Sequence, residues 1–381
     1  MLTEEITPEV VDEVLELTER VERRRRLLPA RAVVYFVLAL CLFSSSDSAG
    51  PPGYRSVLRT LTENPQIRLM ALTECGTHGL VDGAFDGVAR ASEHALARQL
   101  VASLRPDMLL LADRGFTGYE LWGHARATGA HLAWRIKGNQ VFVPLRVLSD
   151  GSFISVMPTP KETVRHGQAR AAGRTLAQPP EGHTVRIIQY TVTVHLKAGP
   201  PRRETFRLVT SLLDHTRAPA RHLAAIYHQR WEIENGYAEL KNRLRGAGFV
   251  LRSKSPELAC QEVYALLTVY QALCALELHA AQRGDIDPDR ISFTVTVQLA
   301  RLKVASQAAA DAITLVAARS EVVRELLDGL LPARRDRQCD RVKKPPKNTF
   351  ETKKRDQPRT PGHIQYTLKV AWHPPLPAET P

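Results

Sequence analysis

The sequence predicts an α/β protein that is interrupted by a segment rich in strands. Residues 66–112 follow the order strand, strand, helix, strand, and residues 138–212 hold strand-like runs separated by glycine and proline. Residues 227–241 form a helical stretch in which polar and apolar side chains separate onto two stripes. With 381 residues, the chain is long enough for two or three domains with real cores.

The composition indicates a basic protein of a reducing compartment. A net charge of +12 and a pI near 9.7 favour a polyanionic partner, although basic solubility explains the charge as well. The 5 cysteines are scattered without a C-x2-C pair, so we expect neither a zinc site nor a disulfide framework, and a cytoplasmic location fits best. The apolar run Ala32–Phe43 is shorter than the roughly 20 residues of a bilayer span, so we expect a buried helix and no membrane.

Residues 1–62 predict a small helical domain. Thr7 and Pro8 form a typical helix start, and a second helix is expected over residues 30–43. Between them, Arg23–Arg26 are placed either to contact DNA phosphates or to complement the C-terminus of the first helix before Pro29. The sequence favours neither interpretation.

Residues 66–85 predict a β-hairpin. Strand-forming residues occupy Gln66–Thr73 and Gly79–Phe85, on either side of a short turn. Asp82 and Asp86 fall at the end of this hairpin, where we expect turn residues rather than members of a functional site.

Asp113 is the strongest candidate carboxylate in the segment that follows. A helix capped by Ser92 is expected first, and then an apolar strand over Met108–Ala112. Asp113 follows that strand directly, at the carboxyl end where α/β sheets present active-site groups. The alternative is that Asp113 caps the next helix, near residues 119–125.

Residues 138–212 predict a β-rich insertion. The run His131–Lys137 before it alternates apolar and basic residues, as a strand does. Four strand-like runs follow within the insertion, namely Val141–Val147, Phe153–Val156, Thr184–Leu196 and Glu204–Leu212. The basic segment Arg165–Arg174 between them is expected to be a loop.

The stretch Tyr227–Lys241 predicts one continuous helix with a polar stripe. At 3.6 residues per turn, Tyr227, Arg230, Glu234 and Lys241 lie within about 60° of one another. Such a stripe offers one carboxylate to a metal ion, and two cations and a phenol to phosphate oxygens. The alternative is a solvated helix face with charges spaced for ion pairs.

The C-terminal third predicts helices followed by a charged tail. Ser255 and Pro256 begin a helix that continues to about His279 and is apolar on nearly every side, so it should be buried. Two further helices are expected over Phe293–Ala318 and Ser320–Leu331. Residues 334–359 carry 11 Lys or Arg against 4 Asp or Glu, which favours a disordered basic tail over residues 333–381.

The spacing Y-x2-R-x3-E-x6-K resembles the signature of transposases of the insertion-sequence-four family, in the DDE superfamily. The segments ADRGF, at residues 112–116, and LRSKSP, at residues 251–256, also resemble that family. The resemblance implies an RNase H-like core with a β-rich insertion that helps to hold DNA. It implies that Asp113 is the second catalytic carboxylate and Glu234 the third, and that Tyr227, Arg230 and Lys241 contact DNA near the cleaved strand.

The resemblance also implies partners and cofactors. Carboxylates of such enzymes hold divalent metal, Mg²⁺ or Mn²⁺, so Asp113 and Glu234 would be metal ligands. The DNA partner would be the inverted-repeat ends of a transposon, bridged by a homodimer, in a bacterial cytoplasm with nucleoid association on DNA. The expected division is 1–62 for the helical domain, 63–137 and 213–332 for the core, 138–212 for the insertion and 333–381 for the tail.

The chain departs from the family pattern at the first catalytic aspartate. No aspartate occurs between Asp47 and Asp82, and the order of strands passes from the N-terminal domain straight into the second strand of the core. We interpret this as an internal deletion that removes strand one. The sequence therefore predicts a DNA transposase with impaired catalysis; the alternative is a DNA-binding remnant that competes for transposon ends without cutting them.

Overall fold

The structure is a computed structural model that describes most of the chain. The described residues are 6–18, 67–88, 90–138, 140–174, 178–195, 202–230, 232–246, 251–253, 255–306, 312–332, 341–344, 349–352 and 365–370. The helix expected over residues 30–43 and the run Arg23–Arg26 lie outside these residues.

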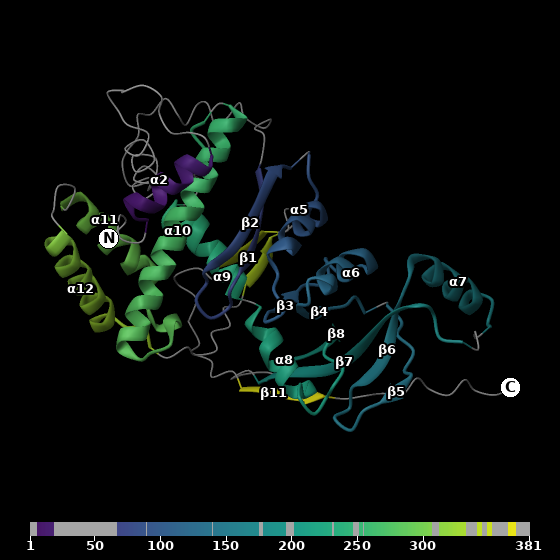
Figure 1. The fold of residues 1–381 in the computed structure, drawn as a ribbon. Coiled ribbons are helices and arrows are strands. Elements are labelled where there is room, and N and C mark those ends of the chain that lie inside the picture. Colours follow the sequence, from purple (N-terminus) through teal and green to yellow (C-terminus); the bar gives the residue numbers. More distant parts are fainter. Residues whose placement is uncertain are drawn as a thin grey trace. The chain divides into compact units, whose positions relative to one another are not determined.

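The chain forms two compact units, each assembled from separated segments. Unit 1 comprises Met1–Ala91 and Trp231–Arg334, and unit 2 comprises Ser92–Arg230 and Arg335–Pro381. Both contain helices and strands, so the fold is mixed α/β, as predicted (Figure 1). The division expected from the sequence has other borders and stays a prediction.

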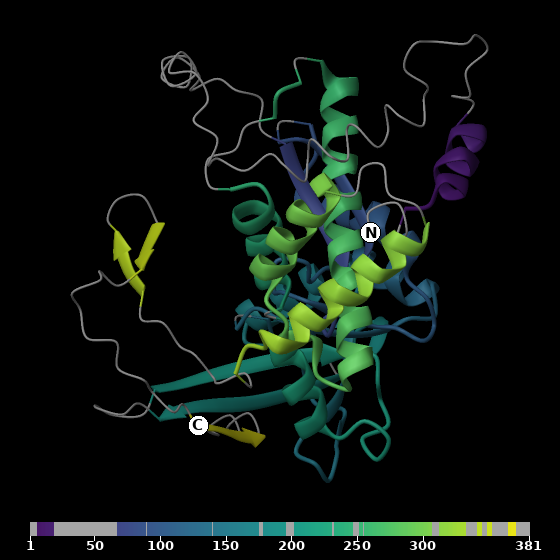
Figure 2. The ribbon, with the colours of Figure 1, turned by 90° about the vertical axis from the view of Figure 1, so that its left-hand side faces the viewer.

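Unit 1 is built on α10, Pro256–Gly284, which packs against α11, Phe293–Ser306, and α12, Ala312–Asp328. α10 begins as predicted at Ser255, whose side chain accepts a hydrogen bond from the Leu258 N–H. Figure 1 shows α10 as the long helix of this unit with α11 and α12 beside it, and Figure 2 shows the same helices turned by 90°. The short helix α2, Pro8–Leu17, likewise starts at the predicted cap, Thr7.

The predicted hairpin is confirmed in unit 1 as β1, Ile67–Thr73, paired antiparallel with β2, Leu80–Gly87. β2 contacts α10. The expectation that Asp82 and Asp86 are turn residues is wrong, because both lie inside β2. Asp82 pairs with Leu72 and Asp86 with Arg68 in the ladder, and each carboxylate accepts a hydrogen bond from the N–H of the glycine after it.

The stretch expected to be one helix is instead three elements. α8, Ala220–Gln229, ends at Arg230; α9, Glu232–Ala238, follows and passes into a π-helix, η2, Glu239–Leu244. α8 packs Tyr227 into the core of unit 2, whereas η2 packs Leu244 into the core of unit 1. The expected polar stripe is therefore not carried by one continuous helix. The π-turns also depart from 3.6 residues per turn.

Unit 2 is organised around a seven-stranded sheet of order β3-β4-β8-β7-β6-β5, with β11 paired to β7. β3 and β4 are parallel, and the other pairs are antiparallel. The strands are β3 Leu109–Ala112, β4 His131–Arg135, β5 Arg146–Val147, β6 Phe153–Pro158, β7 Gly182–His195, β8 Arg202–Thr210 and β11 Gln365–Val370. All the strand-like runs predicted between residues 108 and 212 therefore contain strands.

The helices of unit 2 include one that the sequence reading missed. α5, Glu93–Leu100, begins at the predicted cap Ser92, and α6, Tyr119–Ala127, follows β3. The segment Arg165–Arg174, expected to be a loop, lies mostly within α7, Pro160–Ala171. The start signal was present, since the Thr159 side chain accepts a hydrogen bond from the Glu162 N–H and Pro160 opens the first turn.

Strands also occur in the C-terminal segment for which the sequence predicts disorder. β9, Arg341–Lys344, pairs with β10, Thr349–Thr352, and β11 pairs with β7 from Gln365 opposite His195 to Val370 opposite Tyr190. β11 follows the charged tract and alternates the apolar residues Tyr366, Leu368 and Val370. Alternation with a period of two is typical of a strand. The prediction of disorder rested on charge and did not take this alternation into account.

Within the described residues, α10 is the one helix long and apolar enough to cross a bilayer. Most of its apolar window is buried inside the protein, and its side chains form the centre of the unit 1 core. A helix with this composition and burial is a core helix, as the sequence predicted for this segment.

Candidate functional site

Asp113 directly follows β3, at the carboxyl end of that strand. Its side chain is half-buried, and its Oδ1 accepts a hydrogen bond of 2.7 Å from the Arg114 N–H. The alternative that Asp113 caps the next helix is wrong, because Gly118 occupies the N-cap position of α6. Asp113 thus stands at the end of a parallel strand, where its carboxylate is held by the turn that follows.

Tyr227 links the signature stretch to the end of β3. Its phenol donates a hydrogen bond of 3.3 Å to the carbonyl of Ala112, and the residue is only 3% exposed. Burial raises the pKa of Tyr227 to about 12, and the negative charge of Asp113 acts in the same direction. The phenol therefore keeps its proton at neutral pH and remains a donor. Two motifs more than a hundred residues apart in the sequence meet through this bond.

One arginine contacts the Tyr227 ring, and the charge of a second arginine acts on its hydroxyl. The Arg230 guanidinium carbon lies 5.8 Å from the ring centroid, within the range of a cation–π contact. Arg135, the last residue of β4, stacks over Phe206 at 4.3 Å and forms a 3.0 Å ion pair with Glu204. Both arginines lower the pKa of Tyr227, which places their charges close to it. The sequence reading assigned Arg135 only to a strand face, although it ends the strand parallel to β3.

The remaining signature residues belong to unit 1. Glu234 is exposed on α9, and Lys241 is exposed on η2, with its Nζ 5.0 Å from the ring centroid of Tyr237. Tyr237 itself bonds the edge of β1: its oxygen accepts from the Ala71 N–H at 3.1 Å, and its O–H donates to the Leu69 carbonyl at 3.3 Å. The structure thus brings Asp113, Tyr227 and Arg230 together in unit 2, and it places Glu234 and Lys241 in unit 1.

Unit 1 contains a cluster of acidic side chains around His78 that the sequence did not predict. The ring Nε2 lies 3.1 Å from Glu232 Oε2 and 3.8 Å from Asp289 Oδ1, and the ring Nδ1 lies 3.1 Å from Glu239 Oε2. Burial lowers the pKa of His78, but the two glutamates outweigh this and raise it to about 10. Glu232 and Glu239 are seven residues apart, and His78 and Asp289 are remote in sequence, so no local pattern reveals the cluster.

Further buried polar groups support this His78 cluster. Glu239 also accepts from the Tyr270 hydroxyl at 3.3 Å and from Arg243 at 3.4 Å. Burial raises the pKa of the nearby Glu277 to about 8, even though its carboxylate accepts a 2.8 Å hydrogen bond from Thr296. The interior of unit 1 therefore holds three buried glutamates, Glu232, Glu239 and Glu277, among the described residues.

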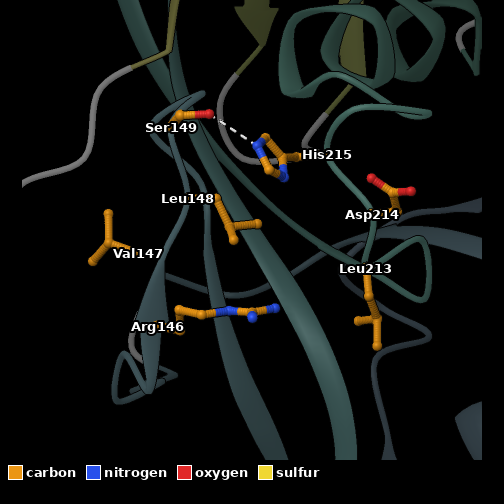
Figure 3. A pocket seen from close by; sticks show the side chains of 7 residues that line it. All are labelled: Arg146, Val147, Leu148, Ser149, Leu213, Asp214 and His215. Atoms are coloured by element: carbon orange, nitrogen blue, oxygen red, sulfur yellow. Dashed lines mark hydrogen bonds between the residues drawn. The ribbon is translucent and has the colours of Figure 1, made fainter.

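Unit 2 has a surface hollow of about 550 Å³ that contains none of the predicted site residues (Figure 3). Its polar lining includes Ser149, whose Oγ lies 2.8 Å from His215 Nε2. The pKa of Asp214, on the same rim, is lowered by hydrogen bonds from the Thr216 hydroxyl and backbone. The full lining is Arg146, Val147, Leu148, Ser149, Leu213, Asp214 and His215.

Two family models match the chain. The model described as the transposase DDE domain matches residues 66–271, more than half of the chain. The model described as the insertion element 4 transposase N-terminal domain matches residues 1–82. The second match covers the segment for which the sequence predicted a helical domain.

One curated protein and one solved structure are similar to the chain. The chain is 29% identical over 292 residues to the transposase InsG for insertion sequence element IS4 of Escherichia coli (strain K12), which covers 74% of this chain and 60% of that protein. The chain thus spans less than two thirds of this relative. A solved piggyBac transposase synaptic complex with hairpin DNA is similar at a TM-score of 0.36 and 10% identity, over 74% of this chain and 55% of that one. The chain belongs to the family of transposases with a DDE domain.

Proposed function

We propose that this chain acts on DNA as a transposase of the insertion-sequence-four type, with impaired strand cleavage. The observation that carries the proposal is the hydrogen bond from Tyr227 to the Ala112 carbonyl. It joins the two motifs that resemble the family, the Asp113 strand end and the start of the signature stretch. Family membership and the likeness to InsG support the same function.

The fold around Asp113 supports descent from an RNase H-like core. β3 and β4 are parallel neighbours, and Asp113 leaves the carboxyl end of β3. The β1–β2 hairpin precedes them in the chain, as the second and third strands of such a core would. In this proposal the segment 138–212, with β5 to β8, is the inserted DNA-holding region.

Asp113 and Glu234 are the residues we expect to hold divalent metal. Both supply carboxylate oxygens, the ligands that suit Mg²⁺ or Mn²⁺. Asp113 is half-buried and Glu234 is exposed. A bound ion would neutralise charge on the phosphate and promote ionisation of the attacking oxygen. Arg230 and Lys241 supply positive charge for DNA phosphates, and Tyr227 positions the strand end that bears Asp113.

Impaired cleavage follows from the number of carboxylates. A clamp of two metal ions normally shares a third carboxylate, and residues 48–81 hold no aspartate. Two strands have an edge without a partner strand, which supports the loss of a strand. Tyr237 bonds the edge of β1 that faces away from β2, and within the described residues β3 pairs with β4 alone. One metal ion contributes several kcal/mol to the transition state, so its loss slows cleavage by many powers of ten.

The expected partner is DNA carrying the inverted repeats that flank this gene, bound by a homodimer in the bacterial cytoplasm. Binding can be measured by fluorescence anisotropy with a labelled end duplex and with a scrambled duplex of equal length. We expect tighter binding to the end duplex, weakened by Arg230→Ala and by Lys241→Ala. The matched control is Arg98→Ala, which removes an exposed arginine paired with Glu120 and should leave binding unchanged. Equal affinity for both duplexes would overturn the proposed end recognition.

A further inference from the structure

The His78 cluster joins three segments of unit 1 that are distant in the sequence. His78 lies in the turn between β1 and β2, Glu232 begins α9, and Asp289 lies in the short 3-10 helix η3, Pro288–Arg290. The His78 and Asp289 side chains are 12% and 18% exposed, and that of Glu232 is 11% exposed. All three side chains are therefore largely buried.

The separations of the donor atoms match those of metal ligands. The Nε2 of His78, the Oε2 of Glu232 and the Oδ1 of Asp289 all lie within 4.8 Å of one another. Ligands bound at about 2.1 Å lie about 3.0–3.4 Å apart in octahedral or tetrahedral sites. The observed separations from Nε2, 3.1 Å and 3.8 Å, are close to this range.

The second ring nitrogen of His78 is already tied to another carboxylate. Its Nδ1 lies 3.1 Å from Glu239 Oε2, and Glu239 is in turn held by Tyr270 and Arg243. Histidines that bind metals commonly donate the opposite N–H to a carboxylate, which fixes the tautomer and the ring plane. Here that bond leaves Nε2 as the nitrogen that faces Glu232 and Asp289, and a metal ion that binds Nε2 would release the proton from this nitrogen to solvent.

We propose that His78 Nε2, Glu232 and Asp289 bind a divalent first-row transition metal, such as Zn²⁺ or Mn²⁺, with Glu239 as the positioning carboxylate. One imidazole and two carboxylates suit these ions, whereas Mg²⁺ prefers a shell of oxygens. This site shares no residue with the pair Asp113 and Glu234, so metal binding here can be tested apart from the proposed DNA chemistry.

Such an ion would fasten α9 to the β1–β2 turn and to η3. α9 also carries Glu234, two residues after Glu232. The metal would therefore fix the start of the helix that presents a proposed catalytic carboxylate. Its effect is structural, and it is measurable without any DNA.

The test uses the full chain carrying Asp113→Asn and Glu234→Gln, so that the proposed DNA-directed ligands are removed. After chelation and dialysis, the protein is titrated with Co²⁺, whose visible absorption bands change in position and intensity when protein ligands replace water. We expect one equivalent to bind and the melting temperature to rise, since a ligand that binds only the folded state stabilises it. Zn²⁺ should displace Co²⁺ at equimolar concentration, and equimolar Mg²⁺ should not.

Single substitutions in this background identify the ligands. His78→Asn removes the ring, and asparagine tolerates the positive φ of 57° at this position, so the fold should survive. We expect His78→Asn and Asp289→Asn to abolish this change in the Co²⁺ bands, and Glu239→Gln to weaken affinity about 10- to 100-fold. The control His94→Asn alters an exposed histidine of unit 2 and should change nothing.

Three results would overturn the proposal. The first is a parent protein that binds no Co²⁺, in which case His78 is a protonated partner of the two glutamates. The second is a change in the Co²⁺ bands that persists in both His78→Asn and Asp289→Asn. The third is displacement of Co²⁺ by equimolar Mg²⁺, which would indicate a site of oxygen ligands elsewhere.

Discussion

At the scale of single residues, the candidate site depends on side chains that connect remote parts of the chain. Tyr227 is the clearest case, because its hydroxyl bonds the carbonyl just before Asp113. The sequence identified Asp113 by its place after an apolar strand and Tyr227 by its spacing to Arg230. It did not reveal the bond between the two segments, which arises only when α8 packs on the sheet. For the same reason the His78 cluster was missed.

Substituting Tyr227→Phe tests that connection. The variant keeps the buried ring and removes only the donor, leaving the Ala112 carbonyl unpaired. We expect the free energy of unfolding to fall by about 1 kcal/mol, the usual net value of such a bond. Urea denaturation measures the change, and Tyr264→Phe, at a tyrosine 58% exposed, is the matched control. Equal stability of the variant and the parent would contradict a hydrogen bond here.

A second residue-scale prediction concerns pH. Burial raises the pKa of Asp150, but hydrogen bonds from Ser152 and Ala220 and the charge of Arg186 outweigh it, so the folded pKa is lowered. A lowered pKa stabilises the folded protein above the unfolded value, near 4, and this contribution is lost as pH falls through the folded pKa. Asp150→Asn should therefore lose less stability than the parent between pH 5 and about pH 2. Urea midpoints across that range measure it. Asp107→Asn, at an exposed aspartate, should follow the parent curve.

At the scale of elements, local sequence patterns located most helices and strands. Caps at Thr7, Ser92 and Ser255 start the helices expected there, and strand propensity located the hairpin and β3. Periodicity could not predict the break between α8 and α9, because the break depends on packing: α8 packs against the core of unit 2, and η2, which continues α9, packs against the core of unit 1. The basic residues of Arg165–Arg174 led to the prediction of a loop, although the residues that start α7, Thr159 and Pro160, could be recognised in the sequence.

The cap of α7 gives a prediction for that helix. Thr159→Ala removes the side-chain oxygen that accepts from the Glu162 N–H. We expect a loss of about 1 kcal/mol in the stability of unit 2, while Thr159→Ser, which keeps the oxygen, should lose little. Amide hydrogen exchange over residues 160–171 locates the effect. Unchanged exchange in Thr159→Ala would show that the cap does not hold this helix.

The edge of β1 gives another prediction at this scale. Tyr237 pairs the Ala71 N–H and the Leu69 carbonyl, two groups that face away from β2. An open strand edge invites pairing with another chain. Tyr237→Phe should therefore raise the concentration-dependent self-association that light scattering detects, whereas Tyr264→Phe should not. A monodisperse Tyr237→Phe protein would show that the phenol does not protect this edge.

At the scale of the whole molecule, charge and family membership are both compatible with the DNA partner that we propose. The net charge of +12 suits a polyanion, and the transposase DDE domain match covers more than half of the chain. The two units are each assembled from two separated segments, so the linear division expected from composition has different borders. Such units are defined by contacts between segments that are remote in the sequence, and the composition of one segment does not reveal these contacts.

Binding through phosphate contacts predicts a steep dependence on salt. If about six phosphates are neutralised, the affinity for an end duplex should fall about 10³-fold between 50 and 200 mM monovalent salt. Arg230→Ala should reduce the slope of log affinity against log salt by about one contact. A slope near zero would show that the basic charge does not serve DNA binding.

The most direct test of the account is a nicking assay on the flanking inverted-repeat DNA with Mg²⁺ or Mn²⁺. The parent protein is compared with Asp113→Asn, Glu234→Gln and the exposed control Asp107→Asn at concentrations that saturate the DNA. We predict that the parent binds the ends and nicks no faster than the Asp113→Asn and Glu234→Gln variants. Nicking by the parent and by Asp107→Asn, abolished in the other two variants, would contradict impaired cleavage and establish a working transposase site.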